Sequence, residues 1–257
     1  MCIRDRSKTI PIMLSFFKRK DKNLEPINFK SLVCDMHSHL IAGIDDGSPD
    51  LETSVQIIKN LQSLGFKKVI TTPHVMHDFY RNTPENILGG LKDLQNELKK
   101  QFVDVEVSAA AEYYIDYEFE TKVDSGEKFL TMGNNQILIE TSFISAPPNF
   151  GDTIFKLQLA GYKLILAHPE RYGFMTFEDL QTYKTRSLSL QLNLLSLLGY
   201  YGPPAKVMAE KLIENNMVDY IGTDCHNLYR SSIYHKCFTN KYWHMLVNSG
   251  TLKNQML

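Results

Sequence analysis

Residues 32–39 read Leu-Val-Cys-Asp-Met-His-Ser-His, a short apolar run that passes directly into two histidines. An apolar run of this length predicts a buried β-strand. Residues i and i+2 of a strand point to the same side, so His37 and His39 can bind one ion together. This stretch therefore predicts the first strand of a core and a polar site at the strand's end.

The same layout recurs along the chain. Further short apolar runs lie at 68–72, 103–109, 136–140, 163–167, 188–194 and 218–222. Segments 51–64, 84–100 and 203–216 lie between such runs and carry apolar residues at helical spacing. This alternation predicts parallel strands joined by crossover helices, with both faces of the sheet covered. An open doubly wound sheet and a closed barrel both fit, although no Gly-x-Gly-x-x-Gly follows the first run to favour dinucleotide binding.

Six of the seven runs end at or near a side chain that can bind a metal. These side chains are His37, His39, His74, Glu112, Glu140, His168, Asp224 and His226. In α/β barrels, residues at the carboxyl ends of the strands meet at one mouth. Carboxylates and imidazoles crowded there would be costly to bury without cations. The set therefore predicts a metal centre.

The kinds of ligand indicate the kind of metal. Imidazole and carboxylate without thiolate suit manganese, iron, zinc or magnesium. About nine candidate ligands exceed the four of one tetrahedral zinc, so we expect two or three ions, an arrangement that typically hydrolyses phosphate esters. The ninth candidate lies in the turn Gly43-Ile44-Asp45-Asp46-Gly47, whose glycines permit a tight loop back to the mouth. We favour Asp46, but spacing alone does not decide between it and Asp45.

Two further observations concern the reaction. Arg171 follows His168 by three residues, where its guanidinium could bind a phosphate oxygen and offset transition-state charge. A surface ion pair with Glu170 is the alternative role for this arginine. Thiol phosphatases need an arginine six residues after the nucleophilic cysteine, and none of the four cysteines has one.

Composition sets the broad class. The chain has 257 residues and a net charge of −1, which suits one core and gives no basic excess for nucleic acid. Four cysteines without a Cys-x-x-Cys pair indicate a reducing cytoplasm. The apolar run 10–17 is too short to span a membrane and lacks a cleavage site. We expect residues 1–31 to form an extension, disordered or partly non-native (1–12 in particular), and 32–257 to form the catalytic domain.

The ordered motifs resemble a known superfamily. Asp-x-His-x-His, Gly-Ile-Asp-Asp-Gly-Ser, Thr-Pro-His, His-Pro-Glu-Arg and Asp-x-His are similar to those of the polymerase and histidinol phosphatase (PHP) superfamily. More narrowly, they resemble the manganese-dependent tyrosine phosphatases of bacterial capsule and exopolysaccharide synthesis. The resemblance implies a distorted seven-stranded (β/α)7 TIM-like barrel that holds three metals, usually manganese.

The resemblance also implies roles for individual residues. One ion would be held by His37, His39, Glu112 and Asp224; Glu112 would bridge to a second, completed by Glu140 and His168; and Asp46, His74 and His226 would hold the third. Arg171 would bind the phosphate, and we assign catalysis to Arg171, His168 and Asp224.

The implied reaction is hydrolysis of a phosphoric monoester. The substrate would be phosphotyrosine in the C-terminal tail of a membrane-bound bacterial tyrosine kinase that regulates polysaccharide export. The protein would act in the cytoplasm, near the inner membrane through that partner, without inserting into it and without binding nucleic acid. Two alternatives share the same metal site: a phosphatase for a small metabolite such as histidinol phosphate, and a non-catalytic, metal-stabilised adaptor for the kinase tail. Composition leaves the oligomeric state open.

Overall fold

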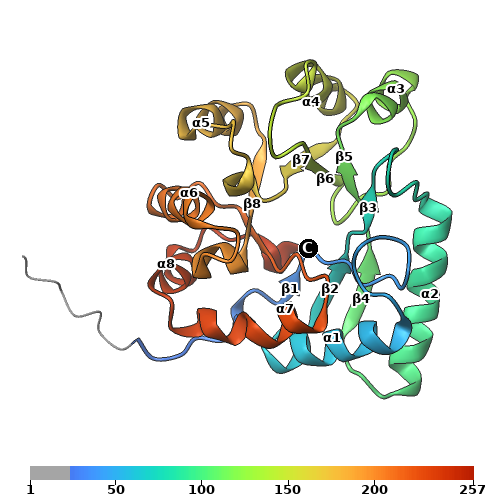
Figure 1. Cartoon of the computed structure of the whole chain (residues 1–257), viewed down its shortest axis with the longest axis vertical. Coiled ribbons are helices and arrows are strands. Elements are labelled where there is room, and N and C mark those ends of the chain that lie inside the picture. Colours follow the sequence, from blue (N-terminus) through green and yellow to red (C-terminus); the bar gives the residue numbers. More distant parts are fainter. Residues whose placement is uncertain (1–23) are drawn as a thin grey trace, which may run out of the picture.

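The computed structural model describes residues 24–257, in which parallel strands curve around a centre and helices lie outside them (Figure 1). One sheet has the order β1 (Cys34–Asp35), β2 (Lys68–Thr71), β4 (Glu106–Ala109). The other has the order β3 (His74–Val75), β5 (Glu112–Tyr114), β6 (Gln136–Glu140), β7 (Lys163–Leu166), β8 (Ser189–Asn193), β9 (Tyr220–Gly222). Every pair of neighbouring strands is parallel, which confirms the predicted α/β class.

Two short breaks divide the strands between the sheets. Thr72 and Pro73 separate β2 from β3, and proline cannot donate the hydrogen bond that a continuous ladder needs. Ala110 and Ala111 likewise separate β4 from β5, and these two strands pair with β2 and β3, respectively. The described residues thus contain nine strands in two sheets, whereas the resemblance implied seven strands in one barrel.

The first and last strands lie side by side. Ser38 and Cys225, just beyond β1 and β9, form a parallel bridge. The Thr223 backbone N–H and hydroxyl donate to the Asp35 carboxylate at 2.9 and 2.6 Å. The fully buried Asp35 therefore ties the start of the chain's core to its end.

Helices cover the outside of the strands (Figure 1). They are α1 (Leu51–Ser63), α2 (Pro84–Lys100), α3 (Tyr117–Ser125), α4 (Phe150–Leu159), α5 (Phe177–Thr185), α6 (Pro203–Glu214), α7 (Leu228–Ile233) and α8 (Lys241–Ser249). Short 3-10 helices are η1 (Phe29–Ser31), η2 (Pro169–Arg171), η3 (Leu194–Leu198), η4 (Tyr234–Thr239) and η5 (Asn254–Met256). Two of the predicted helices begin directly after a residue whose side chain caps the helix: Asp50 caps α1 and Thr83 caps α2. No helix among residues 24–257 is long and apolar enough to cross a membrane.

Strand alternation separates two apolar clusters. Ile137 and Ile139 of β6 pack into the larger cluster with the helices, whereas Leu138 packs into a smaller cluster with Ile165 and Met36. Because side chains alternate along a strand, Glu140 lies on the same side of β6 as Leu138. The alternation that buries the smaller cluster thus also places a carboxylate above it.

The N-terminal boundary differs from the sequence prediction. Phe29 is fully buried and packs against Phe66 and Trp243 with ring centroids 5.3 and 5.0 Å apart. The Trp243 indole N–H donates to the Ile27 carbonyl at 2.8 Å. Ile27 and Phe29, which were predicted to belong to the extension, therefore pack against the domain. The expectations for residues 1–12 and for the apolar run 10–17 fall outside the described residues.

Candidate metal centre

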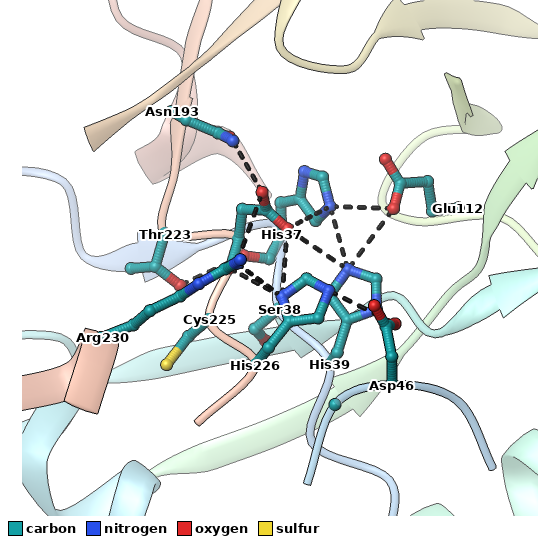
Figure 2. Close-up of polar contacts among 12 residues, drawn as sticks. His37, Ser38, His39, Asp46, Glu112, Asn193, Thr223, Cys225, His226 and Arg230 are labelled. Carbon is teal, nitrogen blue, oxygen red and sulfur yellow. Dashed lines mark hydrogen bonds and ion pairs between the residues drawn. The ribbon is translucent and has the colours of Figure 1, made fainter. Parts of the chain in front are cut away.

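The ligand-type side chains predicted from the strand ends lie close to one another. Figure 2 shows His37, His39, Glu112 and His226 of this set, together with Asp46. His37 and His39, directly after β1, bring their Nε2 atoms within 3.3 Å of each other. Both approach Oε2 of Glu112 on β5, at 3.1 Å from His37 and 3.4 Å from His39. All three side chains are fully buried, so the predicted pairing of His37 with His39 is present at a deep site.

Glu112 joins this pair to the next strands. Its Oε1 lies 3.1 Å from Nε2 of His168, which follows β7, and its Oε2 lies 3.2 Å from Nδ1 of His74 on β3. Glu140, at the end of β6, is 3.6 Å from both of these histidines. One carboxylate thus contacts four imidazoles, since His37 and His39 also lie close to its Oε2.

The glycine-rich turn brings both of its aspartates to the centre in different roles. Asp46 Oδ1 lies 3.6 Å from Nε2 of His74 and 3.5 Å from Nε2 of His226. Asp45 instead lies behind His39, 2.8 Å from Nδ1, and accepts the backbone N–H of Gly47 and of His74. The structure therefore groups Asp46 with the ligand-type side chains and gives Asp45 an orienting contact.

Asp224 closes the centre from the β9 side. Its Oδ1 lies 3.6 Å from Nε2 of His37 and 3.5 Å from Nε2 of His39. Asp224 and His168 have positive φ angles of 52° and 33°. Such backbone is unfavourable for residues with a Cβ and occurs more often at functional sites than elsewhere.

Arg171 lies against the centre and not on an open surface. Its Nη1 donates to Asp224 Oδ2 at 3.1 Å, and its guanidinium carbon lies 4.4 Å from the ring centroids of both Phe143 and Tyr201. Glu170 is buried elsewhere and accepts hydrogen bonds from other groups, among them the Ser196 hydroxyl at 2.6 Å. The alternative of a surface Arg171–Glu170 ion pair is therefore excluded.

Sequence reasoning missed a second arginine. Arg230 on α7 donates from Nη1 to the Asp224 carbonyl at 2.6 Å and lies 2.8 Å from His226 Nδ1 (Figure 2). Asn227 caps this helix by accepting the Arg230 backbone N–H at 3.0 Å. Asn227 directly after His226 is a helix-start signal, and it would have placed position 230 one turn along, facing back to the histidine.

The pKa values of several side chains in the cluster favour the binding of cations. Burial, together with the charge of Glu112, holds the pKa of Glu140 well above its usual range. Burial lowers the pKa of His168 to about 4, and the hydrogen bond with His226 lowers that of Asp46 to about 2. His168 is therefore held neutral, the form that binds a metal, while the positive charges of Arg171 and His39 do not offset the burial of Glu140.

The donor atoms also fit divalent ions. Glu112 Oε2 and His74 Nδ1 are buried and close to ring nitrogens or carboxylate oxygens, but neither atom makes a hydrogen bond of acceptable geometry among the described residues. Three groups have donor atoms within 4.8 Å of one another: His39, Asp46, His74 and His226; His37, His39 and Glu112; and His74, Glu112 and Glu140. Imidazole and carboxylate atoms gathered in this way are a suitable donor set for first-row divalent metals.

Comparisons with known proteins identify the family of the chain. The family described as "Capsular polysaccharide synthesis, CpsB/CapC" matches residues 33–243. Tyrosine-protein phosphatase YwqE of Bacillus subtilis is 27% identical over 196 residues, which cover 76% of this chain and 77% of that protein. Tyrosine-protein phosphatase CpsB of Streptococcus agalactiae is 22% identical over 202 residues, covering 76% and 83%.

A solved structure is similar over most of the chain. It comes from work on YwqE from Bacillus subtilis and CpsB from Streptococcus pneumoniae, described as unique metal-dependent tyrosine phosphatases. It superposes with a TM-score of 0.73 at 25% identity and covers 84% of this chain and 91% of the solved one. The family match spans most of the chain, including all ten side chains predicted for the site. The chain therefore belongs to the CpsB/CapC family of capsular polysaccharide synthesis.

Proposed function

We propose that this protein is a metal-dependent protein-tyrosine phosphatase of capsule or exopolysaccharide synthesis. Its substrate is phosphotyrosine in the C-terminal tail of a bacterial tyrosine kinase, which it meets in the cytoplasm beside the inner membrane. Family membership and the names of the relatives support this activity. The single structural observation that carries the proposal is Glu112, whose carboxylate touches four imidazoles while Arg171 lies at the edge of the same cluster.

The metal centre that we propose follows the groups of neighbouring donor atoms. The ligands are His37, His39, Asp46, His74, Glu112, Glu140, His168, Asp224 and His226, which together hold up to three ions. Manganese is the first candidate, with iron, zinc or magnesium as alternatives. We also propose that β2 with β3 and β4 with β5 each act as one strand, which gives a seven-stranded barrel closed at Ser38 and Cys225.

The protein's own groups position the phosphate. When bound, the metals supply Lewis-acid charge and a water nucleophile that is active at neutral pH. Arg171 Nη1 is held by Asp224, so the rest of the guanidinium can donate to phosphate oxygens. Arg230 is anchored on the Asp224 carbonyl, and its side chain is 17% exposed. It adds a second positive charge next to Asp224. Both arginines offset the charge that grows on the phosphate oxygens in the transition state.

A cavity next to the strand ends that carry Glu112 and Glu140 supports a substrate larger than a metabolite. It has a volume of about 430 Å³ and is lined by Tyr114 and Ser142, each two residues beyond a proposed ligand, together with Tyr117, Pro147 and Pro148. Phe143 and Ile144 in the neighbouring loop are 40% and 87% exposed. Residues that flank a phosphotyrosine in an extended peptide could occupy this surface, whereas histidinol phosphate is too short to use it.

A comparison of substrates tests the proposal. Manganese-loaded protein is given a phosphotyrosine peptide, a phosphoserine peptide of the same sequence, and histidinol phosphate, and phosphate release is measured. We expect the highest kcat/KM for the phosphotyrosine peptide. Preference for histidinol phosphate would keep the metal chemistry but overturn the substrate, and tight binding of the peptide without any phosphate release would favour the adaptor.

A further inference from the structure

β8 is the strand from which the sequence predicted no ligand, yet it contributes two buried amides to the metal centre. Gln191 and Asn193 are fully buried, and they share one side of the strand because they are two residues apart. Buried amides cost free energy unless their hydrogen bonds are made, so their partners show what they do.

A continuous run of hydrogen bonds passes through these amides. His37 Nδ1 lies 2.8 Å from Gln191 Oε1, and Gln191 Nε2 donates to Asn193 Oδ1 at 2.8 Å. Asn193 Nδ2 then donates to Asp224 Oδ2 at 2.7 Å (Figure 2). The run therefore starts at one proposed ligand, His37, and ends at another, Asp224. The second ring nitrogen of His37, Nε2, lies 3.1 Å from Glu112 Oε2 and 3.6 Å from Asp224 Oδ1.

The carboxylate end fixes the direction of every bond in the run. An ionised Asp224 can only accept, so Asn193 must turn its NH2 toward it and its oxygen toward Gln191. Gln191 must then donate its NH2 to Asn193, which leaves its oxygen facing His37. The His168 backbone N–H, 3.3 Å from the same Gln191 oxygen, independently requires an acceptor there. In the neutral imidazole that binds a metal, Nδ1 of His37 is consequently the protonated nitrogen, and Nε2 carries the lone pair on the side of Glu112 and His39.

The neighbouring strand leaves room for this arrangement. A Cβ on Gly222 of β9 would lie 2.7 Å from the His37 Cβ and 2.8 Å from Gln191 Nε2. Real Cβ atoms do not approach other atoms so closely. Glycine at 222 therefore makes space for the histidine and the amide to meet.

We propose that Gln191 and Asn193 are positioning residues that orient His37 and Asp224 for metal binding. This inference rests on the proposed metal centre. The two amides hold the His37 lone pair and Asp224 Oδ1 toward the cluster before a metal arrives, so fewer side-chain motions must be frozen on binding. Groups that hold metal ligands in this way typically change metal affinity roughly 10–100-fold when removed.

Manganese affinity tests the inference without relying on activity. The variants are Gln191→Leu, Asn193→Leu and the double variant, with affinity measured on metal-stripped protein by competition with a fluorescent chelator. Asn254→Leu is the matched control, because Asn254 is an equally buried amide that bonds Cys34 and Ile221 backbone groups away from the metals. We expect each single variant to lose roughly 10–100-fold in affinity, the double variant to lose less than the product of the two, and the control to bind as the original protein does.

Each outcome has a distinct meaning. Folded Gln191→Leu and Asn193→Leu proteins that bind manganese within twofold of the original protein would overturn the positioning role and leave the proposed phosphatase intact. Absence of manganese binding by the original protein would overturn the metal centre itself. If the leucine variants do not fold, Asn193→Asp keeps the volume but places an oxygen against Asp224 Oδ2; the same loss of affinity is expected, and unchanged affinity would overturn the inference.

Discussion

Arg171 is the side chain whose contacts connect the metal centre to a substrate. Phe143 and Tyr201 lie on it at 4.4 Å each, and Asp224 holds one of its nitrogens. We expect Arg171→Ala to raise the barrier by roughly 2–4 kcal/mol, the range for removing one group that stabilises transition-state charge. Steady-state kinetics on a phosphotyrosine peptide would measure this, with Arg186→Ala, an exposed arginine at the end of α5, as the control. Equal rates for both variants would remove Arg171 from the reaction.

The cysteines are predicted to be inert. Burial raises the pKa of Cys225 and of Cys237 to about 12, and it also raises that of Cys34. A raised pKa keeps a thiol protonated, so the thiolate fraction at pH 8 falls roughly a thousandfold. We expect a Cys2→Ser protein to remain unmodified by iodoacetamide at pH 8 and to keep its phosphatase activity, whereas unfolding in denaturant should release three reactive thiols. Rapid loss of activity on alkylation would contradict the exclusion of thiol chemistry.

At the scale of elements, the strand ends were predictable because their signals are local. Every proposed ligand except Asp46 lies at or near the end of an apolar run, and the i, i+2 alternation that pairs His37 with His39 is a property of any strand. The count of strands was not predictable in the same way, because the breaks at Pro73 and at Ala110 depend on how neighbouring strands pair. Helices α3, α4, α5, α7 and α8 were not predicted, since each has ten residues or fewer and gives a helical spacing little length in which to repeat.

The residues that were missed depend on contacts between distant parts of the chain. Gln191 and Asn193 are unremarkable in a strand sequence. They meet Asp224 and His37 only because β8 pairs with β9 and the segment beyond β9 pairs with the segment beyond β1. Phe143 and Tyr201 lie 58 positions apart and meet on Arg171 only through the fold. Phe29 is a lone aromatic in a polar segment, and its burial needs Trp243 from α8.

Gly222 offers a prediction for β9. Gly222→Ala places a methyl group against His37 and Gln191, which must move because both are packed in the interior. We expect a loss of about 1–3 kcal/mol in unfolding free energy from overpacking, together with weaker manganese binding. Urea denaturation and a chelator competition would measure the two effects, with Gly89→Ala on α2, where a Cβ meets nothing within 4 Å, as the control. A Gly222→Ala protein that matches this control in both measurements would show that the space is not needed.

At the scale of the whole molecule, a segment near the start of the described chain packs against a helix near its end. Phe29 near the start packs against Phe66 after α1 and Trp243 in α8, so it connects three distant segments. We expect Phe29→Ala to cost about 3–5 kcal/mol of unfolding free energy, as for other fully buried aromatics. Its metal affinity should not change, because the ring packs against Phe66, Phe238 and Trp243, none of which is a proposed ligand. A cost below 1 kcal/mol would restore the predicted boundary at residue 32.

The most direct test of the metal-dependent phosphatase is phosphate release from a phosphotyrosine peptide by metal-stripped protein, with and without added manganese. We predict no release from the stripped protein, full recovery with manganese, and no recovery in a Glu112→Gln protein, in which the shared carboxylate has lost its charge. Release by the stripped protein at the same rate as the manganese-loaded protein would contradict the central claim, because the clustered histidines and carboxylates would then act without a metal.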